Sequence, residues 1–483
     1  MNSQSLNNKV ANAAKWSGIT EIVSKLITPI SSMVLARLLT PEAFGIVATL
    51  TMIISFAEIF ADAGFQKYLV QHEFRDEIDR DQSSNVAFWS NFIVSMFIWL
   101  LIALFSDPLA ALVGNPGLGY VLTIACVSIP LESFSSIQTA LFKRDFDFKT
   151  LFKVRVVGII IPLIVTIPLA FLLKSYWALI WGTIAQNVVI AVLLTIHSQW
   201  NPKLYYSFQK LKEMLSFTIW SLLETISIWL TGYIDVFIVG TMLNQYYLGL
   251  YKTSSTLVSQ IMGIVTAATT PVLFASLSRL QHSEMEFQDM FFKFQKFVGL
   301  LVIPLGVGIF CFSDLVTGIL LGEQWKEGAG FVGLWGLTSS ITIVLAHYSS
   351  EVYRSKGQPK LSVLAQWLHI IVLFPVVMIF VKQGFETLYV ARSIVRLELV
   401  LVNMLIMYFA VHISPTKMIS NILPAISASL LMALSIYTVR LLGNSLYIQI
   451  IQALVGTVVY ISIIYLFKEE RNVINTYLLK RIK

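Results

Sequence analysis

The sequence contains few charged residues. Only 13% of its 483 residues are Asp, Glu, Lys or Arg, whereas 56% are hydrophobic. An ordinary soluble domain carries about 25% charged residues and about 45–50% apolar ones. So few charges cannot cover the surface of a chain this long in water, and so much apolar sequence excludes a disordered chain. The composition therefore predicts an all-α polytopic membrane protein.

The motifs of common enzymes are also missing. The sequence has no P-loop, no HExxH and no GxSxG. The closest approach to a metal motif of sugar transferases is Asp145-Phe146-Asp147, in a short basic loop with no nucleotide-binding domain around it. The only cysteines, Cys126 and Cys311, lie in apolar runs, where we expect core residues and neither a disulfide nor a metal ligand. We therefore predict no catalytic residue, no metal site and no cofactor, in a chain that is not an enzyme.

Long hydrophobic runs fill the sequence. A helix that crosses a bilayer needs about 20 mostly apolar residues, and on this basis we predict fourteen spans, some of them bent at internal prolines. The first apolar run is too long for a cleaved signal peptide, whose apolar core has about 7–15 residues. The predicted spans are 13–38, 43–67, 86–106, 118–141, 151–173, 176–197, 215–241, 247–276, 294–320, 329–352, 360–381, 385–411, 420–440 and 445–467.

The Lys and Arg residues test this span count, because cytoplasmic loops of membrane proteins carry an excess of them. With the N-terminus in the cytoplasm, 24 of the 34 Lys and Arg residues fall on the inner side, five fall on the outer side and five lie within spans. A wrong span count would disturb this alternation. The distribution therefore predicts that both termini are cytoplasmic. Anionic lipids account for the basic surplus, so no nucleic-acid partner is expected.

A weak internal repeat indicates two related halves. Residues 39–47 (LTPEAFGIV) and 243–251 (LNQYYLGLY) each follow the first span of a six-span unit. Each has a Leu where one helix ends and a Gly where the next begins, which we interpret as a tight outer turn. We therefore predict two pseudo-symmetric six-helix lobes, residues 1–213 and 214–413, followed by a C-terminal hairpin of two spans and a tail at 414–483.

Polar residues recur at helical spacing on the first two spans of each predicted lobe. Steps of three and four residues place them on one face of each helix. A charge inside a bilayer costs about 2.5–3.5 kcal/mol, so each one suggests a function. Stripes that contain charges are expected to line a water-filled cavity, whereas Ser, Thr and Gly alone also suit a helix-packing seam. The stripes are Ser17, Glu21, Lys25, Thr28 and Ser32; Thr51, Ser55, Glu58 and Asp62; Glu224, Ser227, Thr231 and Asp235; and Lys252, Thr256, Ser259, Gly263, Thr266 and Thr270.

Span twelve carries Arg392 and Arg396, which are four residues apart and share a helix face. Two guanidinium groups on one face suit a phosphate. The alternative is that Arg396 pairs with Glu398 or with an acid on another helix. The other charged or titratable residues within spans are scattered, and we expect structural roles for Glu132, Arg155, His347, Glu351 and His369.

Six short stretches resemble, in order, those of one transporter family. They are 36–45 (ARLLTPEAFG), 61–65 (ADAGF), 143–149 (KRDFDFK), 176–182 (YWALIWG), 233–240 (YIDVFIVG) and 248–251 (LGLY). The resemblance that they carry extends over most of residues 13–411. The sequence thereby resembles the polysaccharide transporter family of Wzx-type oligosaccharide flippases, in the MOP (MATE-like) exporter superfamily. Within it, the sequence is most similar to exporters of the colanic-acid and teichuronic-acid type.

The resemblance implies a V-shaped fold of two lobes, shared with multidrug extruders and the lipid II flippase. It also implies transfer of an undecaprenyl-diphosphate-linked oligosaccharide from the inner to the outer leaflet of the bacterial cytoplasmic membrane by alternating access. In such relatives, basic residues of helices one, two and eight meet the diphosphate. The cations at comparable helices here are Lys25 and Lys252, which we expect to be helped by Arg392 and Arg396. They are lysines where relatives have arginine.

The remaining stripe residues complete this expected site. Hydroxyl groups are expected to hydrogen bond to sugar, and the candidates are Ser32, Ser55, Thr231, Thr256 and Ser259. Acids are expected to line the cavity or to bind a driving proton or Na⁺, and the candidates are Glu21, Glu58, Asp62, Glu224 and Asp235. We expect a monomer whose partners are the bilayer, the lipid-linked glycan and other polysaccharide-assembly proteins.

Other classes of membrane protein fit the sequence less well. A MATE-type drug or cation antiporter shares the fold, and the acids of the stripes suit a cationic drug, so it is the main alternative. A polysaccharide polymerase or ligase needs long outer loops, whereas the longest loops here are on the predicted cytoplasmic side. A membrane scaffold without transport leaves the charged stripes unexplained.

Overall fold

The computed structural model describes residues 3–62, 64–443 and 445–474, without the side chains of residues 3–11, 14, 216–221, 223, 224, 473 and 474. Every regular element in these ranges is a helix. Fourteen helical stretches are long and apolar enough to cross a membrane, which confirms the predicted number of spans. They are Lys15–Leu38, Pro41–Asp62, Glu77–Leu104, Gly119–Arg144, Phe148–Leu173, Trp177–His197, Thr225–Met242, Gln245–Arg279, Glu284–Cys311, Glu323–Ser355, Lys360–Gln383, Phe385–Val411, Pro415–Arg440 and Leu446–Leu466.

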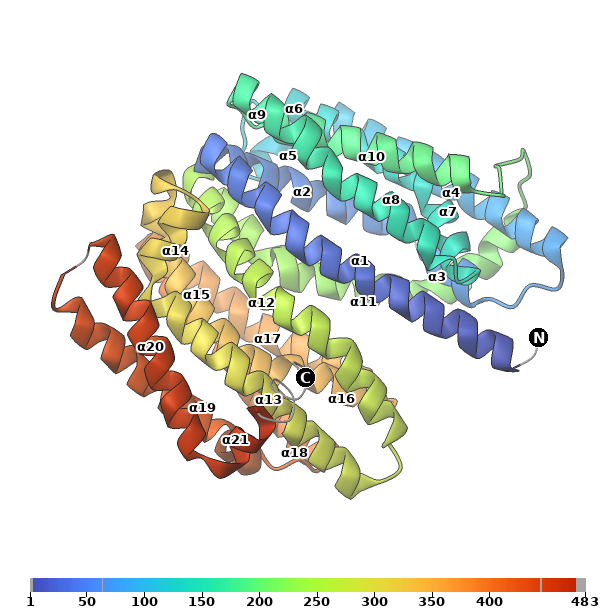
Figure 1. Ribbon diagram of the computed structural model, residues 1–483. Coiled ribbons are helices and arrows are strands. Elements are labelled where there is room, and N and C mark those ends of the chain that lie inside the picture. Colours follow the sequence, from blue (N-terminus) through green and yellow to red (C-terminus); the bar gives the residue numbers. More distant parts are fainter. Residues whose placement is uncertain (1–2, 63, 444, 475–483) are drawn as a thin grey trace. The chain divides into compact units, whose positions relative to one another are not determined.

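The chain folds into two compact units, residues 1–253 and 254–483 (Figure 1). Unit 1 contains α1 (Ser3–Leu38), α2 (Pro41–Asp62), α3 (Phe65–Gln71), α4 (Glu77–Leu104), α5 (Ser106–Leu112), α6 (Gly119–Ala125), α7 (Ser128–Arg144), α8 (Phe148–Ile161), the π-helix η1 (Pro162–Thr166), α9 (Ile167–Leu173), α10 (Trp177–His197), α11 (Phe208–Met242) and the first turns of α12 (Gln245–Arg279).

Unit 2 begins inside α12. It continues with α13 (Glu284–Cys311), α14 (Ser313–Leu320), the 3-10 helix η2 (Glu323–Gly328), α15 (Ala329–Thr342), the π-helix η3 (Ile343–His347), α16 (Ser349–Ser355), α17 (Lys360–Phe380), the 3-10 helix η4 (Val381–Gln383), α18 (Phe385–Val411), α19 (Pro415–Arg440), α20 (Leu446–Leu466) and α21 (Lys468–Ile474).

Proline interrupts some spans and is tolerated in others. In the span 148–173, Pro162 opens the π-helix η1 and Pro168 follows in the first turn of α9, because a proline ring removes one backbone donor and crowds the preceding turn. Other prolines lie inside single continuous helices, as membrane helices allow. These are Pro29, Pro271, Pro304, Pro375 and Pro424.

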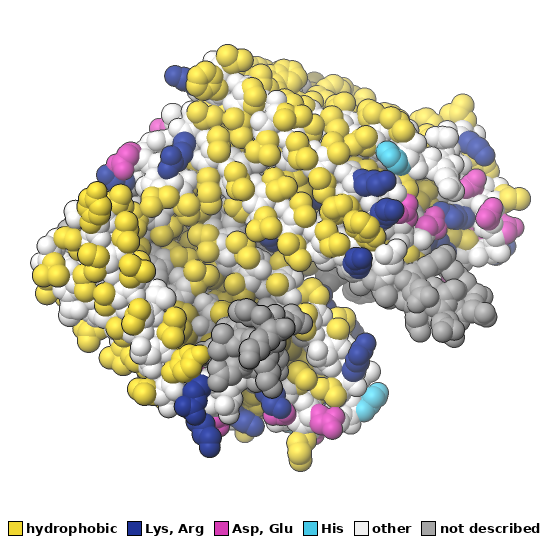
Figure 2. All heavy atoms as spheres, in the orientation of Figure 1, with side chains coloured by type: hydrophobic (Ala, Val, Ile, Leu, Met, Phe, Trp, Pro, Cys, Tyr) yellow, Lys and Arg dark blue, Asp and Glu magenta, His cyan; other side chains and the backbone are white. Residues whose placement is uncertain are grey.

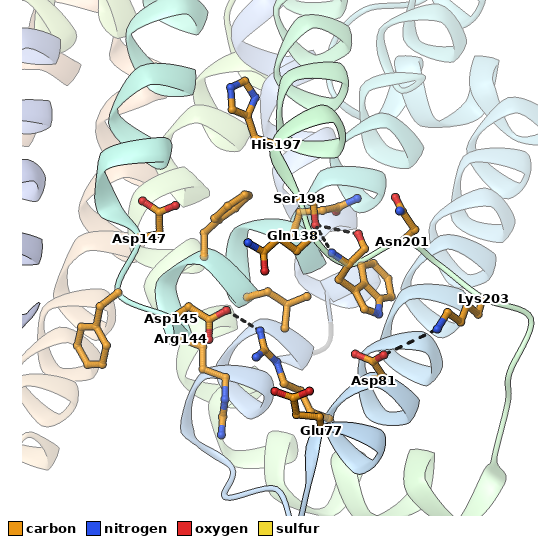
Figure 3. A pocket seen from close by; sticks show the side chains of 16 residues that line it. Glu77, Asp81, Gln138, Arg144, Asp145, Asp147, His197, Ser198, Asn201 and Lys203 are labelled. Carbon is orange, nitrogen blue, oxygen red and sulfur yellow. Dashed lines mark hydrogen bonds and ion pairs between the residues drawn. The ribbon is translucent and has the colours of Figure 1, made fainter. Parts of the chain in front are cut away.

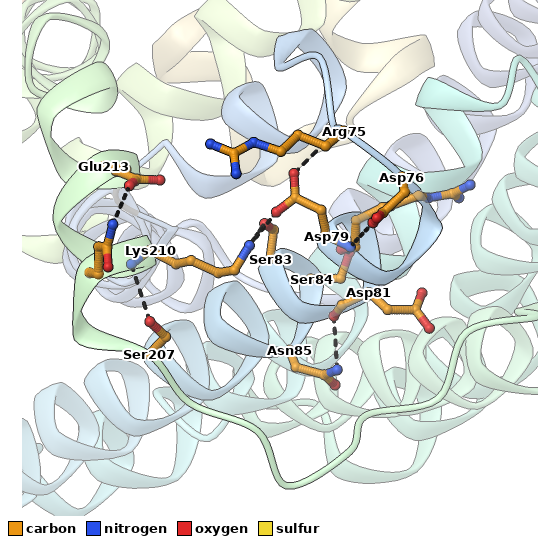
Figure 4. A network of polar contacts seen from close by, with 12 residues as sticks. Arg75, Asp76, Asp79, Asp81, Ser83, Ser84, Asn85, Ser207, Lys210 and Glu213 are labelled. Atoms are coloured by element: carbon orange, nitrogen blue, oxygen red, sulfur yellow. Dashed lines mark hydrogen bonds and ion pairs between the residues drawn. The ribbon is translucent and has the colours of Figure 1, made fainter.

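Polar contacts tie the start of α11 to the start of α4 (Figure 4). Lys210 forms an ion pair with Asp79, and the Asp79 backbone N–H donates to the Asp76 carboxylate at 2.7 Å. Farther along, α11 packs against α2. The first unit therefore ends after Thr253 and includes α11, whereas the sequence repeat places its predicted lobe boundary after residue 213. Packing and repetition divide the chain differently, and the lobe boundary stays a prediction.

The glycines of the predicted repeat make reciprocal contacts in unit 1. A Cβ on Gly45 of α2 would collide with the backbone of Gln245, and a Cβ on Gly249 of α12 would collide with the backbone of Pro41. Both pairs of equivalent positions, 41 with 245 and 45 with 249, are 204 residues apart. These equivalent contacts agree with the repeat, but the interpretation of the glycines as turn residues was wrong. They lie inside helices and permit close backbone approach; they do not form turns.

A second sign of the repeat is a shared Phe-Ser-Asp triplet, which is too short to be noticed in a search for longer matches. Phe105-Ser106-Asp107 starts α5 and Phe312-Ser313-Asp314 starts α14, 207 residues later. Each short helix follows the third span of its half. The capping phenylalanines have nearly the same backbone angles, φ −106° and ψ 25° at Phe105, and φ −112° and ψ 27° at Phe312. The same three residues thus start the same local structure in both halves.

The C-terminal hairpin packs on unit 2. α19 contacts both α20 and α13, and the Tyr460 hydroxyl donates to the Leu300 carbonyl at 2.7 Å. The short α21 returns to α13, where the Lys296 ammonium lies 2.5 Å from Glu469 and 3.3 Å from the buried Glu470. This ion pair lowers the pKa of the Glu469 carboxyl. It therefore stabilises the fold above the usual carboxylate range and loses this effect as the pH falls through the lowered pKa.

Replacing Lys296 by methionine should destabilise unit 2. The change leaves the Glu470 carboxylate buried without its cation, which we expect to cost about 1.5–3 kcal/mol. Lys293→Met is the matched control, because Lys293 and its partner Asp289 are both exposed, and such pairs contribute about 0–1 kcal/mol. Thermal unfolding of the two purified variants measures the difference, and equal melting temperatures would show that α21 is not held by this pair.

The surface has the character expected of a membrane protein. Figure 2 shows hydrophobic side chains over most of the face in view, with charged side chains gathered at a few places near its margins. Large apolar side chains are exposed along the spans of both units, among them Phe171, Leu172, Ile196, Leu401, Leu430 and Leu454. Soluble proteins rarely expose so much apolar surface, so these faces are suited to lipid.

Candidate functional site

The predicted polar residue Ser55 lies where α2 meets α11 in unit 1. The Trp229 indole Nε1–H donates to Ser55 Oγ at 3.0 Å, and Ser55 in turn donates to the Met52 carbonyl at 3.0 Å. The Phe56 ring packs against Trp229, with 4.6 Å between ring centroids. The hydrogen bond fixes the position of the indole, so the two helices present aromatic rings at a defined place.

These rings belong to a row of four that we call the aromatic ladder: Phe60, Phe56, Trp229 and Tyr233. The centroid distances along the row are 5.0, 4.6 and 5.4 Å, and Trp229 and Tyr233 are stacked at 26°. Phe56 and Phe60 are 39% and 38% exposed. Aromatic faces are electron-rich, and the faces of sugar rings carry C–H groups that pack well on them. The aromatic ladder can therefore bind a glycan.

The predicted cation Lys252 lies at the end of this ladder. Its ammonium is 5.1 Å from the centroid of the Tyr233 ring, a cation–π geometry, and the side chain is half-buried. Unit 1 thus places a positive charge beside the aromatic surface, as an anionic group attached to a sugar requires. On α1, Lys25 is half-buried and Glu21 is exposed.

One of the predicted acids has a structural partner in unit 1. Asp235 is buried and accepts hydrogen bonds from the Tyr251 hydroxyl at 2.6 Å and the Val236 N–H at 2.8 Å, so it links α11 to α12. Asp62 ends α2, just before α3 begins, and its Oδ1 is buried without a hydrogen-bond partner. The side chain of Glu224 lies outside the described residues.

Glu58 has a different partner, a second carboxyl group. Its side chain lies close to that of Glu132 on α7, which packs against α2, and the two carboxyl groups interact electrostatically. Two carboxyl groups can hydrogen bond to each other only when one of them carries a proton, because a carboxylate is only an acceptor. The charge of this pair also acts on two neighbouring titratable groups, Glu132 on Asp62 and Glu58 on the thiol of Cys126. The Glu58–Glu132 pair is therefore the candidate proton site among the predicted acids.

Arg392 and Arg396 lie together in unit 2, on α18. Both guanidinium groups lie over the Trp335 ring, 5.0 and 3.8 Å from its centroid, and Arg396 donates to Ser339 Oγ at 2.7 Å. Arg392 is only 7% exposed. Glu398 hydrogen bonds with His369 at 2.8 Å. The two cations do share a face, as the spacing predicts, but they are packed on an indole. The structure places Lys25 and Lys252 in the other unit.

The predicted hydroxyl groups mostly donate to their own helix. Thr231 donates to the Ser227 carbonyl at 2.9 Å, and Ser259 donates to the Ser255 carbonyl at 2.7 Å. Such bonds occupy the hydroxyl proton but leave the oxygen able to accept. Thr256 and Ser259 are exposed, which disfavours a packing seam at these two positions, whereas Ser32 is half-buried.

The rings of the aromatic ladder are the site feature that the sequence prediction missed. Phe56 and Phe60, like Trp229 and Tyr233, are four residues apart, so each pair lies on one helix face next to a polar stripe. This spacing was the available signal. In the described part of the chain, no three His, Cys, Asp or Glu residues gather as a metal site, and both cysteines are free.

Solved structures show which class of protein the fold defines. The lipid II flippase MurJ in an inward closed conformation superposes with a TM-score of 0.77 at 18% identity, over 95% of this chain and 99% of that one. An inward-facing MATE family multidrug transporter of the MOP superfamily gives a TM-score of 0.61 at 13% identity, over 82% and 98%. The chain therefore has the fold of MOP-type membrane transporters.

Sequence comparison gives the family. The model of a family described as polysaccharide biosynthesis protein matches residues 34–329, and the chain belongs to this family. It is 23% identical to the succinoglycan biosynthesis transport protein ExoT of Rhizobium meliloti, over 73% of this chain and 70% of that one. It is 20% identical to the lipopolysaccharide biosynthesis protein WzxC of Escherichia coli, over 67% and 65%. The resemblance to Wzx-type flippases is confirmed.

Proposed function

We propose that this protein moves an undecaprenyl-diphosphate-linked oligosaccharide, the repeat unit of a polysaccharide, across the cytoplasmic membrane of a bacterium. The observation that carries the proposal is the aromatic ladder, which ends at Lys252 and is flanked by Ser55. The family and the transport proteins that resemble the chain support the same class of cargo.

Each part of this cargo has a match in unit 1. Sugar rings stack on Trp229 and Tyr233, while hydroxyl oxygens such as that of Ser55 accept hydrogen bonds from the glycan. The diphosphate is attracted by Lys252 and Lys25, and the lipid tail stays in the bilayer, where it needs no polar partner. Alternating access then carries the headgroup across. In this proposal Arg392 and Arg396 have a supporting role, because both are already packed on Trp335.

A proton bound by the Glu58–Glu132 pair drives the cycle in this proposal. Of the acids predicted from sequence, Asp235 already binds groups of the fold, whereas Glu58 lies beside another acid. A shared proton on such a pair responds to the conformation around it, since separation of the two carboxyl groups changes how tightly it is held. Transport and proton release are thereby linked.

The proposal also covers location and class. The distribution of Lys and Arg favours cytoplasmic termini, and the chain acts as a transporter without catalysing a reaction. A MATE-type antiporter has the same fold, but a cationic drug would meet Lys252 next to the aromatic rings. The proteins that resemble the sequence are named for succinoglycan and lipopolysaccharide synthesis.

Replacing both Lys25 and Lys252 by alanine tests the anion site. Each lysine is expected to contribute about 1.5–3 kcal/mol to a charge-assisted hydrogen bond, so the double variant should lose at least tenfold in transfer rate. In cells that lack the chromosomal copy, the undecaprenyl-linked repeat unit should accumulate in the inner leaflet. The matched control is the double variant Lys149→Ala and Lys153→Ala, whose side chains are exposed on α8. Wild-type export by the first variant would rule out this anion site.

A further inference from the structure

A polar pocket of about 830 Å³ opens at one end of α4, α7 and α10 in unit 1 (Figure 3). The Asp145-Phe146-Asp147 stretch lines it, and the structure gives both acids local partners. Asp145 pairs with Arg80 at 2.6 Å, and Asp147 caps α8 by accepting from the Thr150 N–H at 3.1 Å. The lining carries both signs of charge: Arg80, Arg144 and Lys203 against Glu77, Asp81, Asp145 and Asp147.

An apolar groove of about 470 Å³ lies along the same three helices. It is lined by Phe92 of α4, by Val127 and residues of the first turns of α7 up to Phe134, and by residues of α10 between Val188 and Ile196. Val192 and Ile196 are exposed. The groove therefore opens on the outside of the unit, where a membrane helix meets lipid chains.

The pocket and the groove share helix faces. Along α7 and its two capping residues, Val127 and Asp145, the lining residues follow steps of four and three. A single stripe therefore passes from the groove into the pocket: Val127, Leu131, Phe134, Gln138, Leu141 and Asp145. On α10, Ile196 lines the groove and the next residue, His197, lines the pocket. A molecule that lies along these helices would have its apolar part in the groove and its polar part in the pocket.

Gln138 lies where this stripe enters the pocket. The side chain is 0% exposed, and neither its Nε2 nor its Oε1 has a hydrogen-bond partner. Native proteins rarely leave a buried amide unpaired. The amide nitrogen needs an acceptor and the amide oxygen needs a donor, so a bound group that fits here carries both.

We propose that this is a binding site for a phospholipid whose head carries a phosphate and a primary ammonium, with one acyl chain in the groove. The phosphate accepts from Gln138 Nε2 and meets Lys203, whose side chain is 75% exposed and 4.0 Å from Asp81. The ammonium donates to Gln138 Oε1 and is attracted by the carboxylates of the lining. A trimethylated ammonium has no N–H to donate, and a purely anionic head leaves the acids without a cation. The site does not depend on the transported cargo.

Native mass spectrometry of the full-length protein tests the site, with phosphatidylethanolamine, phosphatidylcholine and phosphatidylglycerol offered in equal amounts. The protein should retain phosphatidylethanolamine about tenfold more than either other lipid. Lys203→Ala and Val192→Trp, which fills the groove, should each reduce this retention about tenfold. Val157→Trp is the matched control, because Val157 is exposed on α8 outside the groove.

Several results would overturn the proposal. Equal retention of the three lipids, or a preference for phosphatidylglycerol, would show that the polar pocket does not selectively bind a headgroup that carries both a phosphate and an ammonium. Retention by Val192→Trp at the wild-type level would show that the groove holds no chain. Lys203 and Val192 are both at least half exposed, so their variants are expected to fold, and thermal unfolding checks this directly.

Discussion

Replacing Trp229 by alanine is expected to lower oligosaccharide transfer about thirty-fold. Trp229 is an inner rung of the aromatic ladder, between Phe56 at 4.6 Å and Tyr233 at 5.4 Å, and its N–H holds Ser55. Its removal leaves a gap where a sugar ring would stack. Truncation of a tryptophan at the centre of a binding surface costs about 2 kcal/mol or more, which corresponds to about thirty-fold in rate.

Three further variants separate stacking from structure. Trp229→Phe keeps a ring and loses the N–H, and Ser55→Ala loses the acceptor of this N–H together with the local bond to the Met52 carbonyl, so both should stay within about threefold of wild type. Trp181→Ala removes an exposed indole of α10 outside the ladder and should have no effect. The measurement is the amount of lipid-linked repeat unit that reaches the outer leaflet, at equal protein levels in the membrane. Equal losses in Trp229→Ala and Trp181→Ala would exclude a specific role for the ladder.

Replacing Glu58 by glutamine is expected to abolish the response of transport to a pH gradient. An amide can bond to the Glu132 carboxylate without a proton, so the pair keeps its contact and loses the group that it exchanges. In proteoliposomes, an imposed pH gradient should accelerate transfer at least tenfold for the wild type and leave Glu58→Gln unchanged. Glu132→Gln should behave in the same way, and the double variant should lose no more than either single one, because the two residues act as one site.

Glu42→Gln provides the control for this experiment. Glu42 is exposed in the first turn of α2, so its substitution changes one charge on the same helix without touching the pair. It should keep the full response to the pH gradient. If a pH gradient accelerates transport by the double variant as much as by the wild type, the Glu58–Glu132 pair is not the coupling site. If a Na⁺ gradient alone accelerates transport by the wild type, the driving ion is Na⁺ and not the proton.

The number and order of the spans could be predicted from the sequence because the bilayer imposes one rule on every helix. Apolar length alone marks each span, and all fourteen are found in the structure. The internal repeat could also be predicted from residues 39–47 and 243–251. The structural role of Gly45 and Gly249 could not be predicted, because it depends on the backbones of Gln245 and Pro41. These come close only when the chain folds.

The candidate site was predictable only in part, because periodicity gives a helix face but not what faces it. The spacing of Ser55 and Glu58 predicts that they lie on one side of α2. It does not predict their neighbours Trp229 and Glu132, because these contacts depend on how α11 and α7 pack on α2. For the same reason Asp235 looked like a transport acid. Its partner Tyr251 lies on the next helix, at a register that one sequence does not reveal.

The reciprocal contact of Gly45 and Gly249 has a mechanical consequence. Interdigitating side chains resist rotation of one helix against another. Where two backbones touch through glycine, no side chains interdigitate. α2 and α12 meet in this way near their first turns, at two equivalent points related by the repeat. Any side chain at position 45 or 249 would therefore push the first turns of α2 and α12 apart, so both positions fix the distance between these turns at backbone contact.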